Sequence, residues 1–561
     1  MNNNIYDAIV VGTGISGGWA AKELCEKGMK TLVLDRGRDV KHIVDYEDMK
    51  SPWELPYRGR ITLQQILDNP IQSKVYNYNE RSRKFFIQDQ DQPYEQDKPF
   101  EWVRGSQVGG KSLIWGRQCY RRSQWDFEAN IKDGHGVDWP IRYEDIAPWY
   151  SYVEKFVGVT GTIEGLSYLP DGEFIPPMPM NCVEQEVAKR VKGKFSDGRM
   201  IIHGRSANLT KKIGTRGPCQ HKGSCDSGHA CSLGGYFSSN AATLPAAAAT
   251  GNMTLRPFSM VQEILYDKEK KKAIGVRIVD TETLKSEEFF AKIIFLNSSA
   301  IQTAAILLNS TSDAFPNGLG NSSGQIGRNL MDMPYGAGAS GQYEGFEDKY
   351  TFGHRPTGIF VPRFRNLNEA TKHKDFLRGY TFQGGAGRWR KGASDGIGKS
   401  FKEELLDPAE NWSMSITGFG EHLPYNENRM YLSKDKKDKF GMPIVHVSCE
   451  FRQNETEMLK DMMVAAAELL EAGGLKNVTT HHHVKLPGEC IHESGTARMG
   501  RDPKTSVLNG WNQMHEVPNV FITDAAAMAS SGTTPGPSIT YMALTARAVD
   551  YAVKELKKLN I

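Results

Sequence analysis

The chain has 561 residues with 69 basic and 66 acidic side chains, so its formal net charge at pH 7 is only +3. This balance gives no electrostatic reason to expect nucleic acid or an anionic membrane surface as a partner. A hydrophobic content of 39% is enough for a sizeable core, and the length favours two or three domains. No run approaches the roughly 20 apolar residues of a membrane helix, so we expect no direct membrane span.

The first segments predict a strand at 5–11, a helix at 15–27 and a second strand at 31–34. Between the first strand and the helix, three glycines have the spacing GxGxxG, namely Gly12, Gly14 and Gly17. Such glycines allow a tight turn, close approach of the backbone to a pyrophosphate, and packing of helix on strand. Asp35 follows the second strand, where a carboxylate can accept hydrogen bonds from ribose hydroxyls. This order predicts a dinucleotide-binding unit in a doubly wound sheet, without separating FAD from NAD.

Further along the chain, an irregular aromatic-rich stretch at 40–100 precedes a predicted glycine-rich loop at 105–117. Alternating or apolar segments predict strands within 255–279 and at 292–296, 359–364, 414–419, 443–449 and 520–522. The remaining predicted helices are 141–156, one that ends at 308, 458–471 and 540–559. The change of texture between about 335 and 480 indicates a second sheet.

Five segments, in this order, carry motifs beyond secondary structure: RGSQVGGKSLIWGRQ (104–118), AIQTAAILLNS (300–310), IGRNLMD (326–332), IHESGTARMG (491–500) and NVFITDAAAM, which contains Asp524. Together with the N-terminal unit they resemble the glucose-methanol-choline (GMC) oxidoreductases over most of the chain. The resemblance is strongest at 5–37, 104–122, 292–332 and 488–553. A single short motif of this kind can be a packing loop, but five in the family's order make that interpretation improbable.

The resemblance implies an α/β fold with a Rossmann-like FAD-binding domain and a second, substrate-binding domain built on an antiparallel sheet (α+β). The FAD-binding domain is then expected in three parts, at 1–160, at 216–334 with a Cys-rich loop, and at 485–561. We expect the substrate-binding domain at 335–484, with an excursion from it at 161–215.

The resemblance also implies FAD as the cofactor, with Asp524 holding its ribityl–phosphate region. The residues expected to bind FAD are Gly12, Gly14, Gly17, Asp35, Arg104, Gly109, Gly110, Ser112, Trp115, Val261, Asp524 and Ser538. Some family members attach FAD through a histidine beside the tryptophan of the glycine-rich segment. Here that position reads Leu113-Ile114-Trp115, so we expect non-covalent FAD.

By the same resemblance, His492 in IHESGTARMG is expected to be the catalytic base. A neutral imidazole suits removal of a hydroxyl proton near pH 7. The family generally has a second His or Asn just before a proline near the last helix, but Gly536 occupies that position here. Three interpretations stay open: Thr533, Thr534 or a water substitutes, His492 suffices alone, or catalysis is impaired.

Three cysteines lie close together in CQHKGSCDSGHAC, namely Cys219, Cys225 and Cys231. Thiolates in one loop can hold an iron–sulfur cluster, as some related sugar dehydrogenases do with a shorter second gap. His221 and His229 could instead complete a zinc site, although the spacing fits no standard finger, and free thiols are the simplest alternative. The His481–His483 triplet is predicted to be an exposed or interface strand, in which only the first and third side chains could converge.

The segment YFSSNAATLPAAAATG (236–251) and the motifs around 118 and 492 are closest to bacterial glucoside 3-dehydrogenases and pyranose-oxidising enzymes. The implied reaction converts a secondary ring hydroxyl of a glucoside or pyranose to a ketone. Candidate substrate contacts in the second domain are Phe382, Gln383, Trp389, Phe419, Glu421 and His422, of which Gln383, Phe419, Glu421 and His422 are preferred.

Two alternatives remain: a gluconate-type dehydrogenase flavoprotein that passes electrons to a partner, and a catalytically impaired flavin-binding protein. A dehydrogenase is favoured over an oxidase, with a small subunit or electron-transfer protein as a candidate partner. The polar N-terminus has no secretory pattern, which favours the cytoplasm. Export together with a signal-bearing partner would place the protein in the periplasm.

Overall fold

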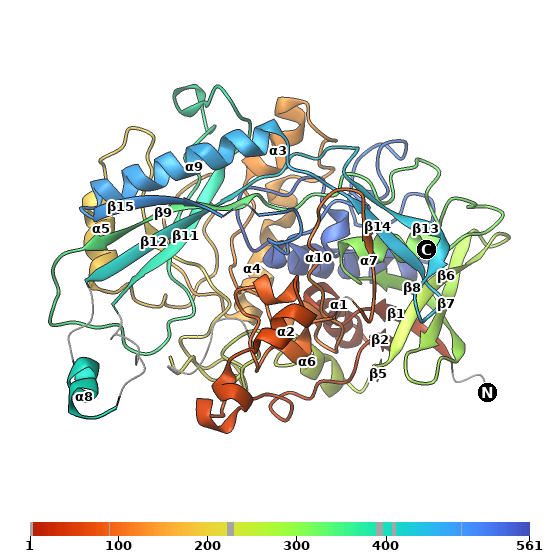
Figure 1. Cartoon of the computed structure of the whole chain (residues 1–561). Coiled ribbons are helices and arrows are strands. Elements are labelled where there is room, and N and C mark those ends of the chain that lie inside the picture. The colour runs from red at the N-terminus through yellow and green to blue at the C-terminus, as the bar shows by residue number, and fades with distance from the viewer. Residues whose placement is uncertain (1–3, 89, 222–228, 389–396, 407–410, 484) are drawn as a thin grey trace.

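A computed structural model of the chain describes residues 4–88, 90–221, 229–388, 397–406, 411–483 and 485–561 (Figure 1). Within these residues the chain forms one sheet of seven strands, one of six and one of three. The seven-stranded and six-stranded sheets lie in different parts of the molecule, and each has its own hydrophobic core. The expected α/β fold with a second antiparallel sheet is therefore confirmed.

The seven-stranded sheet combines a parallel half with an antiparallel hairpin. Its parallel strands are β5 (Met253–Arg256), β2 (Thr31–Leu34), β1 (Ile5–Val11), β8 (Ser286–Leu296) and β16 (Val520–Ile522). Its antiparallel hairpin consists of β6 (Ser259–Asp267) and β7 (Lys272–Asp280). The long β8 pairs with β7 through its first half and with β16 through its second. The parallel strands end at one edge, where open α/β sheets bind their ligands.

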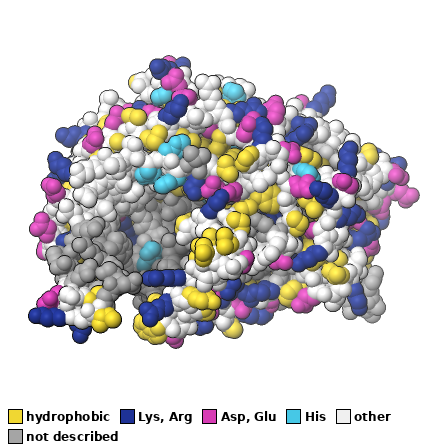
Figure 2. Space-filling view, viewed as in Figure 1, with side chains coloured by type: hydrophobic (Ala, Val, Ile, Leu, Met, Phe, Trp, Pro, Cys, Tyr) yellow, Lys and Arg dark blue, Asp and Glu magenta, His cyan; other side chains and the backbone are white. Residues whose placement is uncertain are grey.

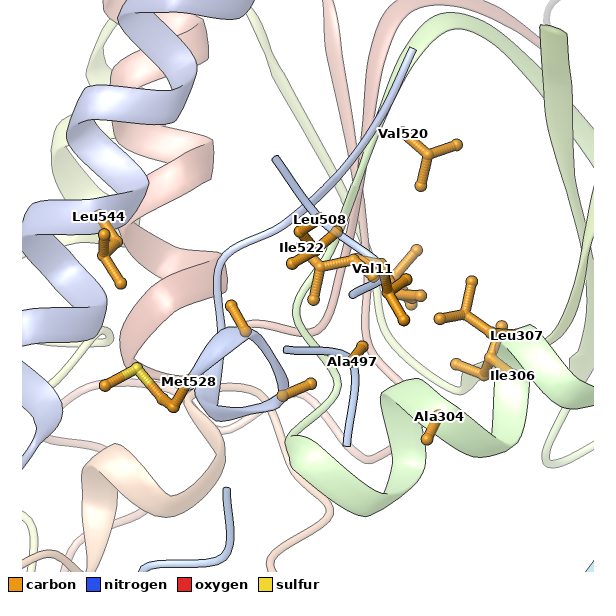
Figure 3. Close-up of a cluster of buried hydrophobic side chains, with 14 of the residues drawn as sticks. Val11, Ala304, Ile306, Leu307, Ala497, Leu508, Val520, Ile522, Met528 and Leu544 are labelled. Atoms are coloured by element: carbon orange, nitrogen blue, oxygen red, sulfur yellow. The ribbon is translucent and has the colours of Figure 1, made fainter. Parts of the chain in front are cut away.

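Five helices of the described part of the chain pack around the seven-stranded sheet. They are α1 (Ile15–Glu26), α4 (Tyr143–Val157), α6 (Thr243–Ala249), α7 (Ala300–Asn309) and α10 (Ser538–Lys557). Figure 3 shows part of the core, where Val11, Ile522 and Leu307 come from three different elements. These contacts hold β1, β16 and α7 together. The first and last predicted strands of the chain therefore pack in the same hydrophobic cluster.

The six-stranded sheet is antiparallel, in the order β15-β9-β12-β11-β10-β4. Its strands are β15 (Lys476–His482), β9 (Tyr335–Tyr343), β12 (Trp412–Gly420), β11 (Tyr380–Gly387), β10 (Ile359–Val361) and β4 (Ile202–His203). Helices α9 (Gln453–Ala472) and α5 (Cys182–Val191) pack on one face, and Figure 1 shows α9 running along the sheet. Alternation along β12 turns Met414 and Ile416 towards this core, so Thr417 and Phe419 lie on the other face.

The third sheet joins β13 (Arg429–Lys437), β14 (Pro443–Ser448) and β3 (Glu95–Gln96). The predicted strand at 443–449 is therefore present, but its assignment to the second sheet is wrong. Met430, Val445 and Val447 pack in the core of the seven-stranded sheet, although they fall within 335–484. Alternation identified the strand and could not identify its partner. By contrast, β4 and α5 from 161–215 do pack with the six-stranded sheet.

Helices α3 (Gln124–Asp133) and α8 (Lys399–Leu406) complete the main helices of the described part. The stretch at 40–100 contains short helical turns and α2 (Leu63–Asp68). Large apolar side chains are exposed along this stretch, among them Val44, Trp53, Leu63 and Leu67. Figure 2 shows hydrophobic side chains gathered over α2 on this face. In the described residues, no helix has the length and apolar character needed to cross a membrane.

Candidate active site

A cavity of about 750 Å³ extends from the strand ends of the seven-stranded sheet to the open face of the six-stranded sheet. Gly12 and Asp35 line the first end, and Gln383 and Phe419 line the second. The cavity therefore joins the predicted nucleotide-binding residues to the predicted substrate-binding domain.

The glycines of the first turn have distinct roles. Gly12 has φ +94°, and a Cβ there would lie 2.4 Å from the carbonyl oxygen of Asn297. A Cβ on Gly17 would lie 1.9 Å from the carbonyl oxygen of Gly12, so Gly17 lets α1 pack on the turn and does not line the cavity. Gly14 lines the cavity and has open space where a Cβ would stand. This is the cradle that a pyrophosphate at a helix N-terminus requires.

Asp35 lies beside this cradle. Its carboxylate accepts hydrogen bonds from Thr13 N at 3.2 Å, from Gly37 N at 3.0 Å and from the Thr13 hydroxyl. Burial raises the pKa of Asp35, and these hydrogen bonds oppose that increase. The carboxylate lines the cavity in a fixed orientation, as a ribose-binding acid must.

The glycine-rich segment at 104–118 closes one side of the cradle. Gly109 N donates to Thr13 Oγ1 at 2.8 Å. Gly109 has φ +98° and packs against Asn240, so it does not line the cavity. A Cβ on Gly110 would lie 3.2 Å from the Cα of Gly14. Ser112 Oγ donates to Gly109 O at 2.6 Å, which fixes the turn that leads to Trp115.

Asp524 follows β16 at the same edge of the sheet. Its carboxylate accepts from Ala526 N at 2.9 Å and from Thr303 Oγ1 at 2.6 Å, and burial raises its pKa to about 6. The predicted cofactor residues that line the cavity are Gly12, Gly14, Asp35, Arg104, Gly110, Ser112, Trp115, Val261, Asp524 and Ser538. A glycine cradle, a fixed carboxylate and a strand-end aspartate in one cavity fit the two halves of FAD.

His492 lies on a loop that one buried carboxylate holds. Asp332 accepts hydrogen bonds from Gly488 N (2.7 Å) and Cys490 N (3.2 Å) through Oδ2, and from His492 N (3.0 Å) through Oδ1. Burial and then the charge of Glu493 raise the pKa of Asp332 to about 7, against these hydrogen bonds. The sequence placed Asp332 in a family motif without a role; the structure shows that it positions the loop of the candidate base.

The His492 ring lines the cavity and is neutral over the physiological range. Burial, followed by the charge of Lys111, lowers its pKa to about 4. Its Nδ1 lies 3.2 Å from Cys490 Sγ, and burial raises the pKa of that thiol well above 9. Sulfur is a weak hydrogen-bond acceptor, so Nδ1 can carry the ring hydrogen and donate to Sγ. In that tautomer Nε2 carries no hydrogen and can take a proton.

The six-stranded sheet presents polar and aromatic side chains to the cavity. Gln383 pairs across the strands with Thr417, and both line the cavity. Phe419 stacks on Tyr335 with ring centroids 5.5 Å apart, and both also line it. Gln383 and Phe419 are therefore where substrate contacts were expected, and the sequence missed Thr417 and Tyr335.

The histidine triplet follows the same sheet. His481 lies in the edge strand β15, and its ring stacks on that of His483 at 5.6 Å. His483 also lines the cavity, so the strand is more than an exposed edge. Alternation along the strand allowed only these two side chains to converge, and their rings do stack.

Glu421 and His422 do not line the cavity, which corrects their assignment as substrate contacts. Glu421 is fully buried, pairs with Arg378 at 2.6 Å and accepts from Thr533 Oγ1 at 3.1 Å. His422 Nδ1 accepts from Asp332 N at 3.1 Å, and its Nε2 lies 3.2 Å from Glu450 O. A Cβ on Gly420 would lie 2.4 Å from Met458 Sδ, so the end of β12 packs closely on α9, and alternation alone could not show this.

Of the other two candidate contacts, Phe382 is buried in the core beneath the six-stranded sheet. Adjacent strand residues face opposite sides, so Phe382 faces away from the cavity that Gln383 lines. Trp389 lies outside the described residues.

Gly536 lines the cavity with φ +76°, and a Cβ there would lie 2.3 Å from the carbonyl oxygen of Gln118. The backbone at 118 thus occupies the space that a side chain at 536 would need. Thr533 does not replace it, because its hydroxyl bonds to Glu421 and to Arg363 Nη1 at 3.3 Å. Neither Thr533 nor Thr534 lines the cavity.

The cysteine loop is described only in part. Cys219 and Cys231 are half-buried free thiols, while Cys225 lies outside the described residues. Burial raises the pKa of Cys219. Among the residues that the structure describes, no group of three or more His, Cys, Asp or Glu side chains could hold a metal ion.

Comparison with known proteins agrees with this geometry. Two profiles described as GMC oxidoreductase match residues 6–335 and 424–545. The fructose dehydrogenase large subunit of Gluconobacter japonicus is 26% identical, over 98% of each chain. The gluconate 2-dehydrogenase flavoprotein of Pantoea cypripedii is 27% identical, over 93% of this chain and 89% of that one.

Among solved structures, the pyridoxine 4-oxidase from Mesorbium loti has the same fold, with a TM-score of 0.61 at 16% identity over 98% of this chain and 99% of that one. The two profiles together span most of the chain and include the glycine cradle, Asp524 and His492. The chain therefore belongs to the GMC oxidoreductase family, the FAD-dependent oxidoreductases that act on CH–OH groups.

Proposed function

We propose that this protein oxidises a secondary ring hydroxyl of a glucoside or other pyranose to a ketone, with His492 as the base. The observation that supports this most is the cavity itself. It joins the flavin cradle, a neutral His492 on an anchored loop and a sheet face with both stacked aromatic and polar side chains. Sugar sites combine these two kinds of side chain.

In the proposed mechanism, Nε2 of His492 takes the proton of the reacting hydroxyl. FAD, when bound, would supply the acceptor for the hydride that leaves the same carbon. Asp332 keeps the histidine loop in place, and the Phe419–Tyr335 stack offers an apolar surface to the sugar ring. Thr417 provides a hydrogen bond to a hydroxyl at the same end of the cavity, where Gln383 adds a hydrogen-bond donor.

Anaerobic mixing of the flavoprotein with a panel of glucosides, free sugars and aldonic acids tests the proposal. We expect at least one pyranose or pyranoside to bleach the flavin absorbance rapidly, with a keto-sugar detected by mass spectrometry. If no compound of the panel reduces the flavin, a non-catalytic flavin-binding role is favoured instead.

We further propose that FAD is bound without a covalent link. Ile114 is buried beside Trp115, where a linking histidine would have to stand. Acid precipitation should therefore leave a colourless protein pellet and a yellow supernatant. A yellow pellet would contradict this proposal.

For the electron acceptor, we propose a dehydrogenase that passes electrons to a partner protein. Two relatives are named as a large subunit and a flavoprotein. The exposed apolar side chains near α2 support the idea, since the same stretch continues to Tyr76 in the cavity wall. Reoxidation of the reduced flavin should be faster with an artificial electron acceptor than with oxygen.

Iron in the purified protein would support a cluster at Cys219, Cys225 and Cys231.

A further inference from the structure

Arg117 is a buried cation in the wall of the cavity. Its side chain is 4% exposed, yet it belongs to the cavity lining. Its backbone has φ +61°, a left-handed conformation that is rare outside glycine and concentrates at functional sites. Arg117 belongs to the glycine-rich segment at 104–118, and the family resemblance implies no role for it.

The guanidinium of Arg117 has few partners in the protein. Its hydrogen bond to Pro356 O is long, at 3.5 Å, and its Nε has no acceptor. It lies over the ring of Tyr236, 4.6 Å from the centroid. Among the described residues no carboxylate forms an ion pair with it.

The neighbouring acidic groups do not neutralise this charge. Burial raises the pKa values of Tyr236 and Cys219, so both are uncharged near pH 7. The other cations near His492 have their own anions: Lys111 pairs with Glu493 at 2.9 Å, and Lys485 with Glu489 at 2.8 Å. A buried charge without a counter-ion is destabilising, so an anion is expected on the cavity side of Arg117.

A second unsatisfied donor lines the same cavity. Gln383 Nε2 is buried and has no hydrogen-bond acceptor in the described part of the chain. Arg117 contacts Pro356, which lies two residues before Gly358. A Cβ on Gly358 would lie 1.8 Å from Gly384 O, so these two segments are in close contact. Gln383 is therefore next to the strand segment that Arg117 reaches. Two donors without acceptors suit a ligand group that only accepts, such as a carboxylate.

We propose that Arg117 and Gln383 bind a carboxylate of the substrate, so that the preferred pyranose is an acidic one such as a uronate or a glucuronide. This rests on the function proposed above. The planar guanidinium can hold both oxygens of a carboxylate, which lysine or an amide cannot do. The two donors lie on the substrate side of the cavity, because Gln383 and the Pro356 that Arg117 bonds to belong to the segment that carries the six-stranded sheet.

Matched pairs of ligands test the proposal: methyl β-D-glucuronide against methyl β-D-glucoside, and D-glucuronate against D-glucose. In the FAD-loaded wild type, we expect the acid of each pair to bind more tightly, measured by the change in flavin absorbance and by the shift in Tm. Arg117→Gln should weaken binding of the acid about 10- to 100-fold and that of the neutral partner less than about threefold. Arg117→Lys should retain part of the preference.

Arg501→Gln is the matched control, because it removes a guanidinium that is 60% exposed and paired with Asp138 outside the cavity. It should leave both members of each pair unchanged. Flavin content and Tm without ligand show whether each variant folds, and removal of an unpaired buried charge should not lower that Tm. Equal or better binding of the neutral sugar in the wild type would overturn the carboxylate proposal while leaving sugar oxidation intact. Failure of every sugar to reduce the flavin would instead overturn the proposed function.

Discussion

Replacing His492 by glutamine is expected to slow flavin reduction by substrate about 100- to 10,000-fold while FAD remains bound. Glutamine is polar and of similar size, so it preserves the loop that Asp332 holds through the backbone N–H of residue 492. It cannot take a proton, and this is the property that the reaction requires. Anaerobic stopped-flow absorbance measures the rate, and the flavin spectrum before mixing measures the bound cofactor.

The pH dependence gives a second readout of the same group. The base works in its neutral form, and burial beside Lys111 lowers the pKa of His492 to about 4. The limiting rate of flavin reduction should therefore rise with pH through about 4 and stay level through neutrality. An ordinary histidine would place this rise near pH 6.5. The residual rate of His492→Gln should lack the rise.

A control separates loss of the base from loss of a histidine in general. His446 lies on β14 beside Glu95, outside the cavity, so His446→Gln should retain the wild-type rate. Wild-type flavin reduction by His492→Gln would contradict the assignment of the base. A variant that loses FAD together with activity would show instead that His492 matters for cofactor binding.

Prediction from sequence succeeded where a local pattern has one physical solution. The GxGxxG spacing allows little besides a strand–turn–helix, and the structure places Gly12 and Gly14 in the turn and Gly17 at the start of α1. Alternation also predicted a strand at 414–419, which the structure contains within β12. In both cases neighbours in the sequence decide the structure.

The failures concern contacts between residues far apart in the chain. Glu421 looked like a polar residue at a strand end, but Arg378 and Thr533 enclose it. Asp332 accepts a hydrogen bond from His492 N, although the two residues are about 160 positions apart in the chain. No local pattern could predict this contact. Whether Arg117 has an anionic partner depends on which side chains surround it, and no motif of one segment records that.

Gly536→Asn is expected to lower stability and flavin content, even though it restores the type of side chain that the family generally has at this position. Asparagine tolerates a positive φ better than most residues, so the φ of +76° is not the main obstacle. The obstacle is the Cβ, which would lie 2.3 Å from Gln118 O and 2.8 Å from Gln118 Cβ. A backbone oxygen cannot rotate away as the end of a side chain can.

The segment around Gln118 would have to move, and with it Trp115 and Arg117 in the cavity wall. Forcing extra atoms into a packed site costs about 1–3 kcal/mol, so Tm should fall and weaker FAD binding should appear as a lower flavin-to-protein ratio. Gly536→Ala should show most of the same loss, because the clash begins at Cβ.

Gly251→Asn provides the matched control. Gly251 has φ +74°, nearly the same backbone conformation, but nothing lies within 4 Å of the place where its Cβ would stand. The same substitution should therefore leave Tm and flavin content near those of the wild type. If Gly536→Asn matched this control in stability and oxidised substrate faster than the wild type, the site would have room for the amide, and Gly536 would mark a weakened catalyst. If it loses stability as expected, the glycine is required by the close approach of residue 118, and His492 acts without a side chain from position 536.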